Sequence, residues 1–425
     1  MASPNNIAER GMAAGLREPT ERFLLGASRG TARTAAQAGR TFAAAQKLSR
    51  PARQPRGPRA DLFDLEPTEE QQLLRDAVRE FALAELRPAA GEADAATSAP
   101  DELLRQANEL GLSTVGVPEE LGGVVEQRSA VTSVLMSEAL AQGDLGLAVA
   151  CLAPGAVSTA ISLWGDADQQ ATYLPEFVGD NVPAAALALL EPRALFDPFA
   201  LGTRARRAGG DFVLEGVKSL VPRARDGEVF VVSAQLDDAR PALFIVESKT
   251  AGISVEPEPA MGVRAAGTGR LIFEGVKVPA GRLLGGADPD VYSACVQLAR
   301  LAWCALAVGT AQAVLDYVIP YVNERRAFGE PISHRQAVAF TVANIAIELD
   351  GMRLATYRAA SRVDQKLPFA REVALARRLC AERGMAIGSD GVQLLGGHGY
   401  VKEHPVERWY RDLRAAGLME GGLLV

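Results

Sequence analysis

The 425-residue sequence has few of the residues that build metal sites and disulfide frameworks. It contains only three histidines and four cysteines, and no two cysteines form a CxxC pair. Structural zinc sites and disulfide scaffolds need clustered ligands or paired thiols, so we expect neither, and no metal. Scattered cysteines favour a reducing compartment, which predicts a cytoplasmic protein, or one of the mitochondrial matrix if the source is eukaryotic.

Several familiar catalytic motifs are also absent. The chain has no GxxxxGK[ST], HExxH or GxSxG, and "GTGRLI", residues 267–272, fails at the last position of GxGxxG. Their absence argues against a phosphate-loop enzyme, a zinc peptidase, an α/β-hydrolase and a dinucleotide-binding Rossmann domain.

Negative charge exceeds positive charge outside the N-terminal arm. The formal net charge is −7, but residues 1–60 carry +8, which leaves −15 for the other 365 residues. Nucleic-acid binding needs basic charge on a folded face, so nucleic acid is not expected as a partner. In the arm, Arg22, Arg29, Arg33 and Arg40 share one side of a helix. This pattern fits either a solvated arm or a helix in peripheral contact with a membrane.

One stretch without charge is long enough to cross a bilayer. "LGLAVACLAPGAVSTAISLWG", residues 145–165, has no charged residue over 21 positions. Its Ala, Gly and Ser content and the "APG" at its centre predict instead two shorter buried segments with a break between them.

Helical periodicity marks both ends of the chain. Thr68 and Gln71 predict a capping box at the first helical pattern, and Ser333 with Gln336 predicts a second one. After the second box, five apolar residues repeat at spacings of four and three, as in the seam of a helical bundle: Val338, Val342, Ile345, Leu349 and Met352.

The middle of the chain has a different period. Short apolar or alternating runs separated by Gly, Pro and Asp predict an antiparallel β module. The sequence therefore predicts an α+β fold in four parts: a basic extension and linker at 1–60, an N-terminal helical domain at 61–181, a central antiparallel β domain at 182–286 and a C-terminal helical bundle at 287–425.

Three C-terminal segments carry residues suited to cofactor chemistry. "NERRAFGEPISHRQ", residues 323–336, offers arginines for a pyrophosphate and a ring for a heterocycle, although a solvated turn has the same composition. "GVQLLGGHGYVKEHPVERWYRDLR", residues 391–414, carries glycines that allow close approach of a ligand, or form a helix C-cap and a turn. "LMEGGLLV", residues 418–425, places Glu420 between apolar residues and glycines. This pattern fits either a carboxylate sheltered from water or a solvated charge near the end of the chain.

In this order, the segments resemble the acyl-CoA dehydrogenase family from about residue 65 to residue 421, with C-terminal motifs most like those of very-long-chain members. The resemblance implies the family's three-part fold, FAD as cofactor and a homodimer or homotetramer. It implies that Glu420 is the catalytic base, and Ala299 stands where some relatives carry theirs. It also implies the residues that hold FAD: Arg325, Phe328 and Gln336 for the pyrophosphate and adenine, and Gln393, Gly396 and Gly397 from the neighbouring subunit.

The implied reaction is α,β-dehydrogenation of a fatty acyl-CoA to a trans-2-enoyl-CoA, as in β-oxidation, with electrons passed to an electron-transferring flavoprotein. A glutamate among apolar groups should have a raised pKa, which suits removal of an α-proton. Small residues on the expected pocket helix allow a deep cavity for long chains, or only close helix packing: Gly155, Ala156, Ser158 and Ala160.

The sequence departs from the family pattern where the flavin ring is expected. Leu190 and Pro222 stand for threonines and Leu220 for a tryptophan, and Pro222 has no N–H to donate. The lost contacts sum to roughly 3–5 kcal/mol, or about two to four orders of magnitude in FAD affinity. A second interpretation is therefore a flavin-poor homologue that acts as a scaffold or as a partner subunit, in a hetero-oligomer with a flavin-bearing paralogue.

Overall fold

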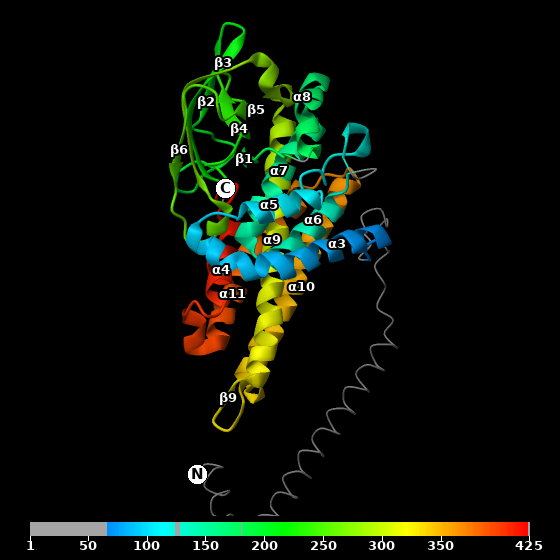
Figure 1. The fold of residues 1–425 in the computed structure, drawn as a ribbon, viewed down its shortest axis with the longest axis vertical. Helices are drawn as coiled ribbons and strands as arrows, with labels where there is room; N and C mark the ends of the chain where they lie inside the picture. The colour runs from blue at the N-terminus through cyan, green and yellow to red at the C-terminus, as the bar shows by residue number, and fades with distance from the viewer. Residues whose placement is uncertain (1–65, 124–127, 180, 424–425) are drawn as a thin grey trace, which may run out of the picture. The chain divides into compact units, whose positions relative to one another are not determined.

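The computed structural model describes residues 66–123, 128–179 and 181–423, all within one unit, Phe63–Val425. Its elements follow the predicted order of helices, strands and helices (Figure 1). The predicted basic extension at 1–60, with its arginine-lined helix, lies outside the described residues.

The N-terminal helices begin where the sequence predicts. Thr68 and Gln71 form the predicted capping box, with Gln71 N donating to Thr68 Oγ1 over 3.2 Å and Thr68 N donating to Gln71 Oε1 over 3.0 Å. The helices are α3 (Glu69–Phe81), continued by a π-turn (Ala82–Leu86), α4 (Arg87–Ala96), α5 (Asp101–Glu109), α6 (Ala130–Ala141), α7 (Leu145–Trp164) and α8 (Ala167–Val178).

The predicted break at "APG" is wrong, because α7 continues through Pro154 as one helix of 20 residues. Burial in the core compensates for the hydrogen bond that Pro154 removes from the helix. Of the most apolar stretch of α7, 72% is buried inside the fold, as in a core helix. Gly155 lets the helix approach a neighbouring backbone closely, since a Cβ there would lie 2.4 Å from Leu112 O.

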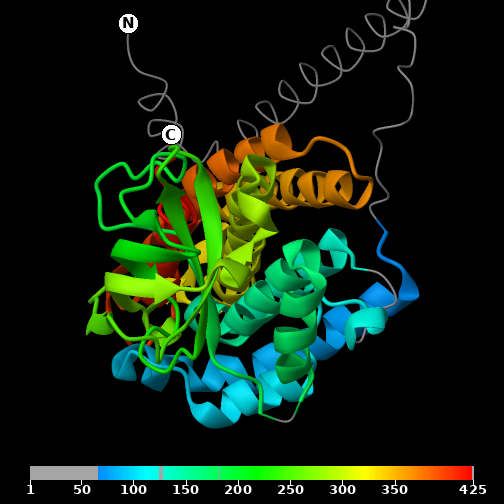
Figure 2. The same cartoon turned by 90° about the horizontal axis from the view of Figure 1, so that it is seen from above.

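The central part is a mostly antiparallel eight-stranded sheet in the order β6-β7-β3-β2-β4-β5-β8, with β1 paired to β4. Two pairs, β1–β4 and β2–β4, are parallel. Figure 2 shows the sheet beside the N-terminal helices and the C-terminal bundle. The strands are β1 (Ala185–Ala188), β2 (Arg204–Ala208), β3 (Asp211–Val221), β4 (Val229–Leu236), β5 (Pro241–Glu247), β6 (Ile253–Pro257), β7 (Gly269–Val278) and β8 (Leu283–Leu284).

The C-terminal bundle is built on two long helices that run side by side and are joined by a short hairpin (Figure 1). The predicted seam of the second helix contributes Ile345, Leu349 and Met352 to a buried cluster. The elements are α9 (Pro289–Glu324), β9 (Arg326–Ala327), β10 (Glu330–Pro331), α10 (Gln336–Asp364), α11 (Ala370–Leu395) and α12 (Val406–Leu413).

The predicted capping box of the second long helix is wrong. Ser333 lies in a 3-10 turn (Ile332–His334), and Arg335 is the N-cap of α10 without a side-chain cap bond. Arg335 has extended backbone angles, φ −81° and ψ 123°, so the helix begins two residues too late for the serine to cap it.

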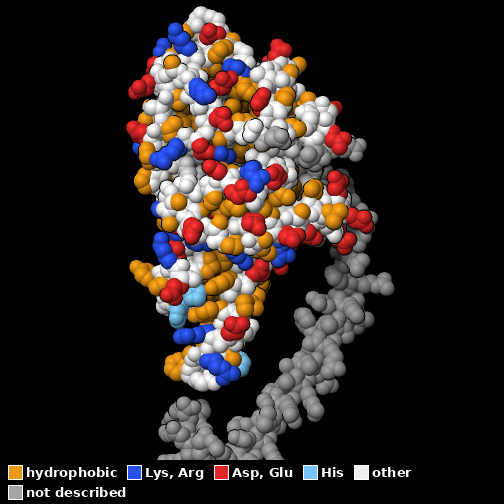
Figure 3. All heavy atoms as spheres, in the orientation of Figure 1, with side chains coloured by type: hydrophobic (Ala, Val, Ile, Leu, Met, Phe, Trp, Pro, Cys, Tyr) orange, Lys and Arg blue, Asp and Glu red, His pale blue; other side chains and the backbone are white. Residues whose placement is uncertain are grey.

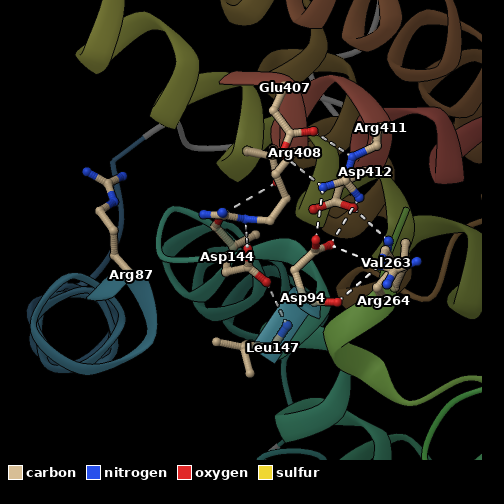
Figure 4. Close-up of polar contacts among 12 residues, drawn as sticks. Arg87, Asp94, Asp144, Leu147, Val263, Arg264, Glu407, Arg408, Arg411 and Asp412 are labelled. Atoms are coloured by element: carbon tan, nitrogen blue, oxygen red, sulfur yellow. Dashed lines mark hydrogen bonds and ion pairs between the residues drawn. The ribbon is translucent and has the colours of Figure 1, made fainter. Parts of the chain in front are cut away.

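A polar cluster joins the three parts of the chain (Figure 4). Arg411 holds both carboxylate oxygens of Asp94 at 3.0 and 3.1 Å, and Arg408 Nε lies 2.8 Å from Asp144 Oδ2. Val263 N donates to Asp412 Oδ1 over 2.6 Å. The cluster therefore fixes α12 against α4, α7 and the loop before β7.

Candidate active site

Glu420 lies in a turn after α12 that two buried arginines hold by its carbonyl groups. Arg300 Nε donates to Glu420 O over 3.0 Å, and Arg377 donates to Met419 O over 2.8 Å and to Gly421 O. Glu420 itself has a positive φ of 58°. Non-glycine residues hold this conformation only where their surroundings enforce it, which is common at functional sites.

The Glu420 carboxylate is 7% exposed and faces different environments with its two oxygens. Trp303 Nε1 lies 3.4 Å from Oε1 and donates to it, whereas Oε2 is buried without a hydrogen-bond partner. Burial raises the pKa of Glu420, and the Trp303 N–H and the charges of Arg377 and Arg300 oppose that rise. A raised pKa makes this carboxylate a stronger base for removing a proton.

Glu420 borders a cavity of about 220 Å³. The cavity is largely apolar, with walls from α6, α7, α9 and the segment after α5. We call it the Glu420 cavity. Gly155, Ala156 and Ala160 line it as predicted, but Ser158 is fully buried and donates to Ser113 O instead.

The substituted flavin-contact residues Leu190, Leu220 and Pro222 line the same cavity. The neighbouring hydroxyl of Ser219 is already used, because it donates to Glu258, which also accepts from Leu220 N over 2.7 Å. This wall therefore offers a flavin ring mainly apolar contact.

A buried ion pair fixes the two segments that carry these residues. Lys218 is fully buried, and its Nζ lies 2.9 Å from Glu191 Oε1 and 2.9 Å from Ser233 Oγ. Burial lowers the pKa of Lys218 to about 8. The ion pair was not predicted, although a lysine inside the apolar run of β3 could have indicated it.

The other predicted cofactor residues border a second cavity at the far end of α9. Its lining includes Arg325, Phe328, Gln393, Gly396 and Gly397, and we call it the Arg325 groove. No described atom lies within 4 Å of a Cβ built on Gly396 or Gly397, so both leave room for a ligand. Gln336, the first residue of α10, is exposed and does not line the groove.

The groove suits the dinucleotide end of FAD. Arginine supplies charge for a pyrophosphate, and the glycines allow close approach. Phe328 supports the same interpretation, because it is 96% exposed with a positive φ of 56° and so is available to pack against a ligand or another chain. The residue assignments stay predictions.

Three family models match the chain: the N-terminal, middle and C-terminal domains of acyl-CoA dehydrogenase, at residues 68–180, 186–276 and 290–422. With the fold and the two cavities, they define a flavin-dependent oxidoreductase. The chain belongs to the acyl-CoA dehydrogenase family and is an acyl-CoA dehydrogenase with FAD as its cofactor.

Individual relatives agree. The chain is 34% identical over 373 residues to the mitochondrial short-chain specific acyl-CoA dehydrogenase of Mus musculus, with 84% of this chain and 88% of the relative covered. It is similar to a structure of glutaryl-CoA dehydrogenase from Mycobacterium smegmatis in complex with FADH2, at 25% identity and a TM-score of 0.78, with 84% and 92% covered. It is also similar to a structure described as the electron transferring flavoprotein of Acidaminococcus fermentans, at 29% identity and a TM-score of 0.79, with 85% and 97% covered.

Proposed function

We propose that the enzyme converts a fatty acyl-CoA to the trans-2-enoyl-CoA, with Glu420 removing the α-proton. The observation that carries this proposal is the unpartnered Oε2 of a buried carboxylate at the edge of an apolar cavity. FAD, which Arg325 and the glycines of the Arg325 groove would hold, would supply the acceptor for the hydride of the β-carbon. Arg300 and Arg377 keep the Glu420 backbone in place, and the apolar walls exclude water around the carboxylate.

The test is product formation with an artificial electron acceptor. Purified enzyme with flavin absorbance should convert straight-chain acyl-CoA thioesters to products two mass units lighter, identified by chromatography against trans-2-enoyl standards. A flavin-loaded enzyme that releases no such product would contradict the proposal. A series from C4 to C16 would give the chain length, for which Gly155, Ala156 and Ala160 in the cavity wall support long chains only weakly.

We further propose that the electrons pass to an electron-transferring flavoprotein. The likeness to the Acidaminococcus fermentans structure supports this partner class. Reduction of a purified electron-transferring flavoprotein by enzyme and acyl-CoA, but not by either alone, is the expected result.

The exposed apolar residues of the bundle support a dimer or tetramer. Phe340, Ile347 and Leu354 lie seven residues apart on α10 and are 64%, 67% and 47% exposed. Residues seven apart share a helix face, so these three form one apolar stripe. Hydrophobic side chains are also visible at the surface of the helical part in Figure 3.

A hetero-oligomer with a flavin-bearing paralogue is a second arrangement. Leu190, Leu220 and Pro222 around the Glu420 cavity favour it, because they weaken ring binding. Protein purified alone would then be colourless and would gain flavin only with its partner.

A further inference from the structure

One charged side chain on the Glu420 cavity has no role in the reaction above. Arg128 precedes α6 and lines the cavity, and its Nε is buried without a hydrogen-bond partner. No carboxylate in the described part of the chain lies within ion-pair distance of it. Burial disfavours the charged form and lowers the pKa of Arg128. Burying an arginine side chain without a counter-ion raises the free energy of the folded state, unless a bound ligand supplies the opposite charge and the hydrogen-bond acceptors.

The acidic residue whose charge acts on Arg128 is Asp364, and its oxygens are already occupied. Asp364 accepts hydrogen bonds from Ser129 Oγ at 2.8 Å, Ala130 N at 2.6 Å and Val131 N at 3.1 Å. These bonds fix the first turn of α6, so Asp364 is committed to the helix. Arg128 therefore keeps its hydrogen-bonding capacity for the cavity.

Arg128 shares the largely apolar lining with a few residues that carry hydroxyl groups. Ser133 and Ser137 follow it on the α6 wall, and Thr159 faces the same cavity from α7. Glu420 belongs to a different wall, formed by the chain end with Trp303 of α9. A thioester with its α-carbon at Glu420 would direct the rest of its acyl chain into the space that Arg128 borders.

We propose that Arg128 binds a carboxylate at the far end of the acyl chain, so that the preferred substrates are CoA thioesters of dicarboxylic acids. This inference rests on the proposed function, because it takes Glu420 as the group that fixes the α-carbon. Guanidinium pairs well with a carboxylate through two parallel hydrogen bonds. The hydroxyl of Thr159, which lines the same cavity, can add a further contact to an anion, whereas that of Ser133 already donates to Ser129 O.

The test compares binding of two reaction products that the enzyme cannot oxidise further. The FAD-loaded enzyme is titrated with trans-2-enoyl-CoA thioesters of equal length that end in a carboxylate or in a methyl group. The wild type should bind the carboxylate form at least 10-fold more tightly, since a charge-assisted pair is worth about 10- to 100-fold. Arg128→Gln should abolish the preference while leaving the methyl form unchanged, and Arg128→Lys should restore part of it.

Arg371→Gln is the control, because Arg371 is 81% exposed on its side chain and does not line the cavity. Equal binding of both thioesters by the wild type, or a preference that survives in Arg128→Gln, would overturn the inference. If Arg128→Gln weakened the binding of both thioesters equally, Arg128 would contact the CoA moiety that they share, and the inference would also be overturned. Failure of either thioester to bind the wild type would instead count against the proposed function.

Discussion

At the scale of single residues, the contact between Trp303 and Glu420 sets the state of the carboxylate. The indole N–H reaches Oε1 from α9 and leaves Oε2 without a partner toward the cavity. A hydrogen bond to the charged form lowers a carboxyl pKa, whereas burial raises it. Trp303 is thus a positioning residue that moderates the basicity of Glu420.

We predict that Trp303→Phe moves the pH dependence of flavin reduction by acyl-CoA. Loss of the N–H removes a group that lowers the Glu420 pKa, so the part of the pH profile that reports ionisation of this carboxylate should move to higher pH. Trp164→Phe is the control, because Trp164 lines the same cavity, whereas the indole that donates to Glu420 is that of Trp303. Identical pH profiles in the wild type and Trp303→Phe would show that the indole bond has no effect on the base.

The residues of the site were only partly accessible from the sequence. Family motifs predicted roles for Glu420 and the arginine-glycine segments, and these residues line the two cavities. Trp303, Arg377 and Lys218 were not predicted, because each acts through a neighbour more than 25 residues away in the chain. Gln336, at the start of α10, is exposed and does not line the Arg325 groove, so its role stays a prediction.

At the scale of elements, α7 depends on a close approach that no apolar pattern reveals. A Cβ at Gly155 would lie 2.4 Å from Leu112 O, so α7 or the segment after α5 would have to move. Gly91 in α4 has no atom within 4 Å of its built Cβ. Both glycines lie inside helices, but only Gly155 lies close to another backbone segment, so alanine at Gly91 serves as the control for alanine at Gly155.

We predict opposite effects of alanine at these positions. Gly155→Ala should lower the free energy of unfolding by about 1–3 kcal/mol through steric overlap. Gly91→Ala should raise it by about 0.5–1 kcal/mol, because alanine favours an exposed helix interior. Denaturant unfolding measures both, and a neutral Gly155→Ala would contradict the packing of α7.

Secondary structure could be predicted where the hydrophobic pattern was long. The prediction failed where packing against other segments determines the conformation. The runs of β3, β4, β5 and β7 stand out by their apolar residues, whereas β2, with the sequence "RARRA", has few of them and β8, with the sequence "LL", is only two residues long. Pairing with neighbouring strands, which a local pattern does not contain, makes these segments strands. The continuous α7 has the same cause, since burial on most sides compensates for Pro154.

At the scale of the whole molecule, the polar cluster of Figure 4 makes stability depend on pH. Burial, with the nearby charge of Asp144, raises the pKa of Asp412 to about 8. The folded state then binds a proton that the unfolded state lacks between about pH 4 and pH 8. The associated stability is present at pH 4 and is lost as the pH rises to 8.

We predict that Asp412→Asn flattens this dependence. The amide keeps an oxygen for Val263 N but does not titrate, so the melting temperature should fall less steeply between pH 5 and pH 8 than in the wild type. Asp168→Asn, at an exposed position on α8, should leave the slope unchanged. A variant slope as steep as that of the wild type would assign the pH dependence to other groups.

The two cavities share no lining residue, and the family resemblance predicts that one FAD contacts two subunits, with Gln393, Gly396 and Gly397 contributed by the neighbouring one. We predict that Ile347→Glu disrupts the apolar stripe of α10, yields smaller assemblies in analytical ultracentrifugation and lowers the ratio of flavin to protein. Val178→Glu is the control, because Val178 is 44% exposed on a different helix, α8. An intact assembly with full flavin content in Ile347→Glu would contradict this interface.

The central claim is that the buried Glu420 carboxylate removes the α-proton of an acyl-CoA. Anaerobic addition of acyl-CoA to the flavin-loaded enzyme tests it most directly, by following the flavin absorbance. We predict rapid bleaching in the wild type. Glu420→Gln should keep FAD bound but react at least 1000-fold more slowly, because its amide cannot accept the α-proton. A 1000-fold slower reaction corresponds to an activation free energy that is about 4 kcal/mol higher. Bleaching at the wild-type rate in Glu420→Gln would contradict the central claim.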